Sequence, residues 1–366
     1  MTTTSVTLED LPLRDELRGE HPYGAPQLDV AVRLNVNENP YPLSASIAAD
    51  MGRAVAEAAP GLNRYPDRDA VSLRADLAAY LSAEATAGIT VDNVWAANGS
   101  NEIMLQLLQA FGGPGRTVLS FVPTYSMYPE YARETHTAWL AAPRAEDFTI
   151  DVADAVEQLG AHRPDVILLA SPNNPTGTAL PLAVIEAIYA AAPGMVIVDE
   201  AYAEFRRAGT PSALSLLPSH PRLVVTRTMS KAFALAGGRL GYLAAASAVV
   251  DAMRIVRLPY HLSAVSQAVA RVALANVDEL LSRVADLRAE RDATVAWLRS
   301  RGLSAADSDA NFVLFGVLPE RHAVWQHLLD RGVLIRETGP EGWLRVSIGT
   351  PDEMAAFRCA LEEVLP

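Results

Sequence analysis

Lys231 is the side chain most suited to covalent chemistry, because it is the only lysine among 366 residues. The other 29 of the 30 basic residues are arginines. A coding bias toward arginine explains this depletion, since arginine replaces lysine well wherever only a positive charge is needed. Arginine does not replace a nucleophilic amine, because its guanidinium group stays protonated. The retention of a single lysine therefore makes Lys231 a candidate for covalent chemistry.

The residues around Lys231 could bind an anion. Thr228 and Ser230 place hydroxyl groups at alternate positions before the lysine. Arg239 follows within the glycine-rich segment Ala236–Gly241, where a second contact to an anion could form. A glycine-rich loop with ordinary capping residues is the alternative interpretation of this segment.

A second candidate anion site lies at Ala97–Glu102, where an apolar run gives way to a helical pattern. Gly99 permits a tight turn, and Ser100 or Asn101 can cap the helix. The free N–H groups and the positive dipole end of such a helix start suit a phosphate. Capping without any ligand remains an open alternative.

Two further polar segments follow apolar runs. Asp199 comes directly after Met195–Val198, and a buried acid there is costly without a partner. It is either the cap of the next helix or a carboxylate held ionised beside a cation. The segment Ser171–Gly177 contains two prolines, two asparagines and a glycine, which fix a loop. The amide of Asn174 could reach a ligand from that loop, although the segment alone indicates only a turn.

Short apolar runs predict the buried parallel strands that would position these segments. The runs are Val94–Ala97, Thr117–Phe121, Val166–Leu169, Met195–Val198, Leu223–Thr226 and Leu240–Ala244. Helical patterns lie between several of them, near 102–111, 125–133 and 181–191. This alternation predicts an α/β fold with a mainly parallel central sheet flanked by helices on both faces.

The expected organisation is an arm followed by two domains. Residues 1–30 would form an N-terminal arm with one short helix near Leu11–Arg18, because Pro22, Gly24 and Pro26 break anything longer. Residues 31–280 would form the large, cofactor-binding domain. Residues 281–366 would form a smaller α+β C-terminal domain, because strand and helix patterns alternate again there.

Parallel sheets bind ligands at the carboxyl ends of their strands, where all of these polar segments would meet. One lysine, one carboxylate, one amide loop and an anion site suit a phosphorylated, cationic cofactor that carries an aldehyde. Pyridoxal 5′-phosphate forms a Schiff base with an amine, and its ring withdraws electrons when the ring nitrogen is protonated beside an acid. The sequence therefore predicts pyridoxal 5′-phosphate as the cofactor.

The same segments carry a resemblance to a known family. The motifs occur in family order at Leu34–Pro40, Asn63–Pro66, Pro123–Tyr128, the Asn174 loop, Asp199–Tyr202, Thr228–Phe233 and Leu344–Arg345. Over essentially its whole length the chain resembles the fold-type I pyridoxal-phosphate aminotransferases. Within them it is similar to the class-II family of histidinol-phosphate aminotransferases, of the actinobacterial type. The resemblance implies reversible amino transfer between glutamate or 2-oxoglutarate and imidazole-acetol phosphate or L-histidinol phosphate, in histidine biosynthesis.

The resemblance also implies roles for the cofactor-binding residues. Lys231 would bind the cofactor covalently and carry a proton, and Asp199 would pair with the protonated ring nitrogen. Tyr202 and Asn174 would bond the ring oxygen, and Tyr125 would stack on the ring face. The residues implied for the cofactor phosphate are Ser100, Asn101, Thr228, Ser230 and Arg239.

The resemblance implies substrate contacts as well. Arg345 would grip the carboxylate of glutamate or 2-oxoglutarate through a bidentate pair, and Arg336 would join it to bind the substrate phosphate. Tyr23 and Tyr260 would close over the substrate, with core packing as the open alternative for both. Asn37 would lie beside the site.

The implied partners are small molecules and a second copy of the chain. Tyr65 would reach the cofactor phosphate of a neighbouring subunit, which implies a homodimer with shared active sites. The formal net charge of −13 argues against a general nucleic-acid binder. The single cysteine, Cys359, and the histidine spacing indicate no metal site. We expect a cytoplasmic protein without membrane contact, because no apolar run reaches the roughly 18 residues of a span.

Three other functions compete with this interpretation. An aromatic amino acid aminotransferase would use the same cofactor residues with a different substrate pocket. The segment Asn35–Pro40 and the pair Arg336 and Arg345 favour the phosphate substrate. A phosphothreonine decarboxylase is more remote, because its chemistry removes the carboxylate rather than transferring the amine. A non-catalytic cofactor sensor is also remote, since every expected catalytic residue is present.

Overall fold

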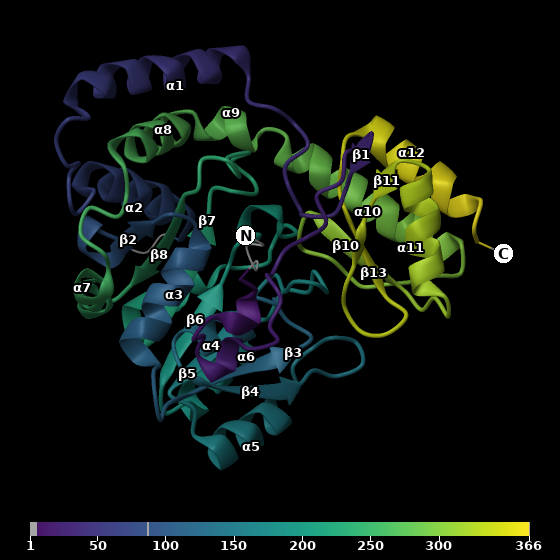
Figure 1. Cartoon of the computed structure of the whole chain (residues 1–366), viewed down its shortest axis with the longest axis horizontal. Helices are drawn as coiled ribbons and strands as arrows, with labels where there is room; N and C mark the ends of the chain where they lie inside the picture. The colour runs from purple at the N-terminus through teal and green to yellow at the C-terminus, as the bar shows by residue number, and fades with distance from the viewer. Residues whose placement is uncertain (1–5, 86–87, 366) are drawn as a thin grey trace, which may run out of the picture.

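A central seven-stranded sheet organises the larger part of the molecule (Figure 1). The computed structural model describes residues 6–85 and 88–365. In spatial order the strands are β2 (Val94–Ala97), β8 (Gly241–Ala245), β7 (Leu223–Thr228), β6 (Met195–Asp199), β5 (Val166–Ala170), β3 (Thr117–Val122) and β4 (Ala138–Pro143). Strand β8 runs antiparallel to both of its neighbours, and the pairs from β7 to β4 are parallel. The predicted α/β fold with a mainly parallel sheet is confirmed.

Side chains that alternate along the strands enter two apolar cores, one on each face of the sheet. On β2, Trp95 and Ala97 face one core, whereas Val94 and Ala96 face the other. The first core is covered by α3 (Ser100–Phe111), α4 (Tyr128–Glu134) and α7 (Ser247–Val256). The second is covered by α2 (Val71–Ala85), α5 (Val152–His162), α6 (Leu182–Ala191) and α8 (Ala264–Ala275), with α1 (Ala45–Ala58) packed on α8. Both faces are covered, which is why the strands are apolar throughout.

A smaller lobe lies beside this body and carries the C-terminal elements (Figure 1). Its sheet has the order β12 (Arg336–Glu337), β13 (Leu344–Ser347), β10 (Phe312–Gly316) and β9 (Ser304–Ala305). Its helices are α10 (Val284–Ser300), α11 (Arg321–Asp330) and α12 (Pro351–Glu362). Strand β1 (Val32–Arg33) pairs in parallel with β11 (Val333–Leu334), so residues assigned by prediction to the large domain contact this lobe. The domain boundaries at 30 and 280 stay a prediction.

The N-terminal arm crosses the body next to α4. Its first five residues lie outside the part of the chain that the structure describes. The predicted helix near Leu11–Arg18 is wrong, because the arm forms two separate 3₁₀ turns at Leu8–Asp10 and Asp15–Leu17. Neither turn buries a residue, so no packing supports a longer helix. Within residues 6–85 and 88–365, no helix is both long enough and apolar enough to cross a membrane.

Candidate active site

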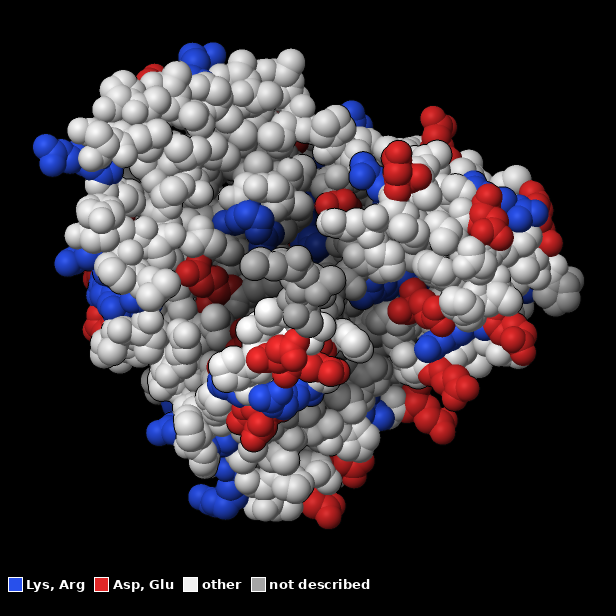
Figure 2. Space-filling view, in the orientation of Figure 1, with Lys and Arg blue, Asp and Glu red and all other residues white. Residues whose placement is uncertain are grey.

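A cavity of about 1150 Å³ lies between the carboxyl ends of β5 to β7, the arm and the small lobe. Figure 2 shows a hollow at this position with Lys and Arg atoms inside it. Fourteen residues predicted from the sequence line the cavity: Tyr23, Asn37, Ser100, Asn101, Tyr125, Asn174, Asp199, Tyr202, Thr228, Ser230, Lys231, Arg239, Arg336 and Arg345. The structure therefore brings together segments that are more than 300 positions apart in the sequence.

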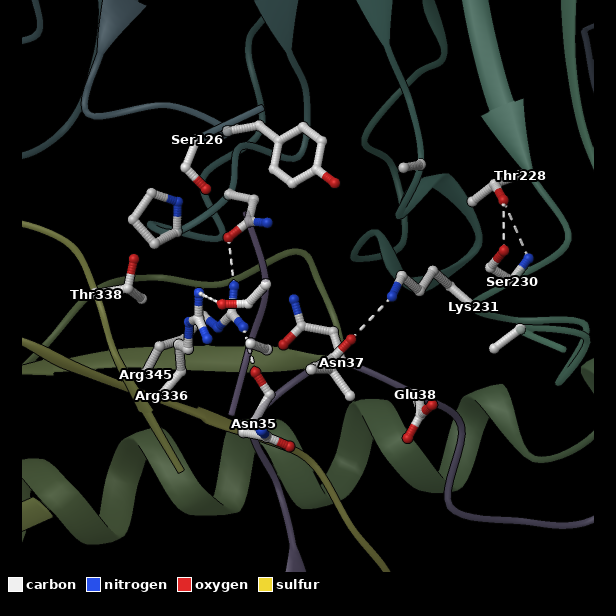
Figure 3. Close-up of a pocket in the computed structure, with 18 of the residues that line it drawn as sticks. Asn35, Asn37, Glu38, Ser126, Thr228, Ser230, Lys231, Arg336, Thr338 and Arg345 are labelled. Atoms are coloured by element: carbon white, nitrogen blue, oxygen red, sulfur yellow. Dashed lines mark hydrogen bonds between the residues drawn. The ribbon is translucent and has the colours of Figure 1, made fainter. Parts of the chain in front are cut away.

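Lys231 lies in the middle of the cavity, just beyond the end of β7. Its Nζ donates to the carbonyl oxygen of Val36 at 2.9 Å. Thr228 and Ser230 lie on one side of it, and Arg336 and Arg345 lie on the other (Figure 3). Burial, together with the nearby Arg345 cation, lowers the pKa of the Lys231 amine to about 8. A larger fraction of the amine is therefore neutral, and nucleophilic, near pH 7 than for an exposed lysine.

The side of the cavity at Thr228 is built to bind an anion. The Thr228 hydroxyl lies 3.0 Å from Ser230 Oγ, and Arg239 Nη1 lies 3.4 Å from the same oxygen. Gly99 precedes α3 with a φ of +90° and has no side chain to cap the first N–H groups of the helix. A Cβ at Gly99 would lie 2.6 Å from Arg239 Nη2, so the guanidinium rests directly against this turn. Helix dipole, hydroxyls and guanidinium thus converge on one point.

Asp199 ends β6, lines the cavity and is only 8% exposed. Its Oδ1 accepts from the Thr226 hydroxyl and from the Ala201 N–H, both at 3.2 Å. Its Oδ2 accepts from the Tyr128 hydroxyl at 3.1 Å. Burial raises the pKa of the Asp199 carboxyl to about 6, while these hydrogen bonds act to lower it. The carboxylate is ionised at neutral pH and faces a cavity where it could pair with a cationic ring.

Tyr202 is held between two asparagines. Asn37 Nδ2 donates to the Tyr202 hydroxyl at 3.0 Å, and Asn174 Nδ2 approaches the same oxygen at 3.5 Å. Asn37 is itself fixed by Ser347, whose hydroxyl donates to Asn37 Oδ1 at 2.8 Å. The buried Asn311 amide donates to the Asn37 carbonyl at 3.0 Å. The phenol of Tyr202 is thus oriented toward the cavity by groups from both lobes.

Arg336 and Arg345 stand directly opposite each other on β12 and β13. Like charges at such a cross-strand position repel each other. Two of the Arg345 N–H groups are already hydrogen-bonded: one donates to Asn174 Oδ1 at 2.5 Å and one to the Asn35 carbonyl at 2.7 Å. Burial lowers the pKa of Arg345 to about 10, which leaves it charged at neutral pH. An anionic ligand between these arginines would relieve their repulsion.

Two of the predicted residues do not line this cavity. Tyr65 is 78% exposed and stacks on Tyr260, with the ring centroids 4.3 Å apart. Both tyrosines lie on the outer surface, so their predicted roles require a neighbouring molecule or a rearranged loop and stay predictions. Tyr23 does line the cavity, and its hydroxyl lies 2.8 Å from Ser126 Oγ.

Sequence reasoning missed Tyr128 and Asn35 as parts of the site. Tyr128 is adjacent in sequence to predicted residues, but its bond to Asp199 spans 71 positions. Asn35 donates to the Pro26 carbonyl of the arm at 2.8 Å, while its own carbonyl binds Arg345. Both residues occur within the family motifs, which was the one available signal. Their partners depend on the tertiary fold.

Comparison with known proteins identifies the family. The family model for aminotransferase class I and II matches residues 30–361. The chain belongs to the class I and II aminotransferases. It is 65% identical to the histidinol-phosphate aminotransferase of Thermobifida fusca, over 98% of this chain and 96% of the relative. It is 61% identical to histidinol-phosphate aminotransferase 3 of Burkholderia lata, over 99% of this chain and 98% of the relative.

Solved structures of this aminotransferase family share the fold. The histidinol-phosphate aminotransferase of Sinorhizobium meliloti, solved in complex with pyridoxal 5′-phosphate, superposes with a TM-score of 0.80. It is 24% identical, and the match covers 92% of this chain and 91% of that structure. The fold-type I architecture predicted from the sequence is therefore confirmed.

The cavity of this aminotransferase fits pyridoxal 5′-phosphate by the chemistry of its donors. The anion cradle at Ser100, Thr228 and Ser230 suits a phosphate, and the buried Asp199 carboxylate suits a protonated ring nitrogen. The partly neutral amine of Lys231 lines the same cavity and suits an aldehyde. These three features face one cavity from three different strand ends.

Proposed function

We propose that this chain is a histidinol-phosphate aminotransferase that uses pyridoxal 5′-phosphate. It would transfer an amino group reversibly between glutamate or 2-oxoglutarate and imidazole-acetol phosphate or L-histidinol phosphate. The cross-strand pair Arg336 and Arg345 carries the proposal, because two opposed cations at the mouth of a lysine site suit a dianionic substrate. The names of the relatives at 54–65% identity support the same assignment.

The cofactor, when bound, supplies an aldehyde that condenses with amines and a ring that withdraws electrons from the substrate α-carbon. Lys231 would hold that aldehyde at rest. Once the substrate amine replaces it, the freed amine would act as general base and acid on the α-proton. Asp199 would keep the ring nitrogen protonated, and Tyr202 with Asn174 would bond the ring oxygen. Tyr125 would stack on the ring face, and Ser100, Asn101, Thr228, Ser230 and Arg239 would bind the phosphate.

The two substrates would use one cavity in turn. Arg345 would bind the α-carboxylate of glutamate, and the product 2-oxoglutarate would then leave. Imidazole-acetol phosphate would next place its phosphate between Arg336 and Arg345. Tyr23, held by Ser126, would cover this end of the cavity. Tyr260 lies outside this cavity, so it would reach a substrate only in a neighbouring copy or after a rearrangement of its loop.

Substrate preference tests the proposal. With 2-oxoglutarate as acceptor, kcat/KM should be higher for L-histidinol phosphate than for phenylalanine, because only the phosphate engages both arginines. Arg336→Ala should lower kcat/KM for L-histidinol phosphate by about 10- to 100-fold, as loss of a hydrogen bond to a charged group implies. The value for phenylalanine should change far less. Preference of the unmodified protein for phenylalanine would instead assign an aromatic amino acid aminotransferase, and equal losses would remove Arg336 from phosphate binding.

The assignment of Lys231 is tested separately. Lys231→Ala should abolish turnover with either amino donor while the protein still binds the cofactor noncovalently. The unmodified protein should be yellow as purified, because the bound cofactor absorbs visible light. Unchanged turnover of Lys231→Ala would falsify covalent attachment at this residue.

We further propose that the active unit is a homodimer with shared sites. The segments that join α1 to α2 and α7 to α8, together with the last turn of α7, expose Leu62, Tyr65, Ile255, Leu258 and Tyr260. Tyr65 stacks on Tyr260 across these segments. Apolar side chains grouped in this way are typical of protein interfaces. A second copy covering this surface could bring Tyr65 to the cofactor phosphate of its neighbour.

The expected cytoplasmic location stays a prediction.

A further inference from the structure

Tyr128 is a buried tyrosine directly behind the candidate cofactor site. It is the first residue of α4, its side chain is 0% exposed, and its hydroxyl donates to Asp199 Oδ2 at 3.1 Å. The residue does not line the cavity, so it has no direct access to a ligand. Its contact with the ligand site runs entirely through Asp199.

The three donors around Asp199 fix the plane of its carboxylate. Tyr128 from α4 binds Oδ2, whereas the Thr226 hydroxyl from β7 and the Ala201 N–H bind Oδ1. The oxygens are therefore held from both sides, by groups on three separate segments. A carboxylate that cannot rotate presents its remaining lone pair in one direction, toward the cavity.

The neighbouring Tyr131 shows that packing alone does not explain the phenol of Tyr128. Tyr131 lies on the same helix and is 2% exposed, so both residues fill the same core. Among the described residues, the Tyr131 hydroxyl has no hydrogen-bond partner. The Tyr128 hydroxyl, in contrast, donates to the one acid at the end of β6 that faces the cavity.

We propose that Tyr128 is a positioning residue for the cofactor ring, which acts by orienting Asp199 and stabilising its ionised form. The proposal rests on the assignment of Asp199 to the ring nitrogen of pyridoxal 5′-phosphate. Removal of the phenol would leave the Asp199 carboxylate free to turn on the Oδ2 side and would withdraw one donor from its charge.

The charges around Asp199 support this role. Burial is the main cause that raises the pKa of Asp199 to about 6, and the bond from Tyr128 is the largest of the effects that oppose it. Glu200 is the adjacent acid and also raises the pKa of Asp199, but Arg227 pairs with it at 2.8 Å. The other titratable groups that face Asp199 are the phenols of Tyr125, Tyr131 and Tyr202. Burial raises the pKa of all three phenols, so they stay neutral over the working pH range.

The test compares Tyr128→Phe with the matched variant Tyr131→Phe in full-length protein. Cofactor is removed, and the dissociation constant for added pyridoxal 5′-phosphate is measured by absorbance between pH 5 and pH 8. Tyr128→Phe should weaken binding at neutral pH by about tenfold, as loss of a hydrogen bond to a charged group implies. In the unmodified protein the affinity should fall below about pH 6, where Asp199 becomes protonated, and this fall is called the acid limb. In Tyr128→Phe the midpoint of the acid limb should lie about one pH unit higher, because a tenfold loss and one pKa unit both correspond to about 1.4 kcal/mol. Tyr131→Phe should change neither quantity by more than twofold.

The possible outcomes distinguish positioning of Asp199 by Tyr128 from a purely structural role of Tyr128. They also test the assignment of Asp199 to the ring nitrogen. Unchanged affinity and an unmoved acid limb in Tyr128→Phe would overturn the proposal, as would equal losses in both variants. Thr226→Val removes a donor from Oδ1 and should move the limb in the same direction as Tyr128→Phe. Asp199→Asn tests the underlying assignment, because it should eliminate the limb altogether. If Asp199→Asn keeps both affinity and limb, Asp199 does not pair with the ring, and the role of Tyr128 falls with it.

Discussion

At the scale of single residues, the chemistry of the site depends on the surroundings of Lys231. Lys231 is half-buried in the cavity, and its amine donates to a neutral carbonyl rather than to a carboxylate. Burial penalises the charged form, and the Arg345 cation adds to that effect. Glu38 acts in the opposite direction but does not outweigh burial. The sequence identified this lysine by elimination, and the structure adds the physical cause of its reactivity.

The lowered pKa of Lys231 predicts how covalent capture of the cofactor depends on pH. The neutral amine is the nucleophile, so the rate at which cofactor-free protein captures added pyridoxal 5′-phosphate should rise with pH around a midpoint near 8. Arg345→Gln removes a cation that disfavours the ammonium form, so its midpoint should lie at a higher pH. Stopped-flow absorbance measures both rates. A midpoint near the ordinary lysine value of 10.5 in the unmodified protein would contradict this account.

The sequence predicted most of the cavity lining because these residues follow strand ends, and parallel strands bring their carboxyl ends to one edge. It did not predict which groups hold the lining in place. Tyr128 and Asn35 act on Asp199 and Arg345 through contacts between distant segments. Tyr65 and Tyr260 were assigned by resemblance, and in one chain they stack on the outer surface instead.

At the scale of elements, a buried ion cluster connects the strands that carry Asp199 and Lys231. Arg227 on β7 is 1% exposed and pairs with Glu200 at 2.8 Å and with Glu84 of α2 at 2.5 Å. Arg206 joins Glu84 at 2.6 Å. Although burial alone would raise the pKa of Glu84, its bonds to Arg227 and Arg206 lower it. The cluster holds α2, β7 and the segment after β6 in one arrangement.

Removal of one member should destabilise the fold strongly. Arg227→Met leaves the buried Glu200 carboxylate without its main partner, so the free energy of unfolding should fall by about 3–5 kcal/mol. Glu84 would keep its pair with Arg206. Arg271→Met is the matched control, because Arg271 is 51% exposed and pairs with Asp76 at 2.7 Å on the surface. That variant should lose no more than about 1 kcal/mol. Urea unfolding of the holoenzyme followed by circular dichroism measures both, and similar losses would show that the buried cluster has no special role.

Two peripheral elements, β4 and α5, escaped prediction for different reasons. Strand β4 is an edge strand with only Ala142 fully buried, so it gives little alternation. Helix α5 has apolar residues at helical spacing (Val152, Ala155, Val156 and Leu159) behind an Asp151 cap, a signal that the prediction did not use. The pairing of β1 with β11 joins residues about 300 positions apart, so no local pattern along the chain specifies it.

At the scale of the whole molecule, the exposed stack of Tyr65 on Tyr260 bears on how the sites are completed. If each active site were formed by one chain, Tyr65 would contact neither cofactor nor substrate, since it does not line the cavity of its own chain. In a homodimer with shared sites, each site would combine Lys231 of one subunit with Tyr65 of the other. The two arrangements predict different behaviour when two defective chains are combined.

Coexpression of Lys231→Ala with Tyr65→Ala distinguishes these arrangements. If sites are shared, one site of each mixed dimer receives both defects, and its other site combines a native Lys231 with a native Tyr65. Random pairing makes half of the dimers mixed, so activity should reach about a quarter of the unmodified level, provided that each variant alone is nearly inactive. If each chain supplied its own Tyr65, every site would keep one defect and coexpression would restore nothing. Steady-state assays of the unfractionated coexpressed protein measure this gain. Mixed dimers purified through two different tags should reach about half of the unmodified level, and sedimentation confirms that the purified species is a dimer.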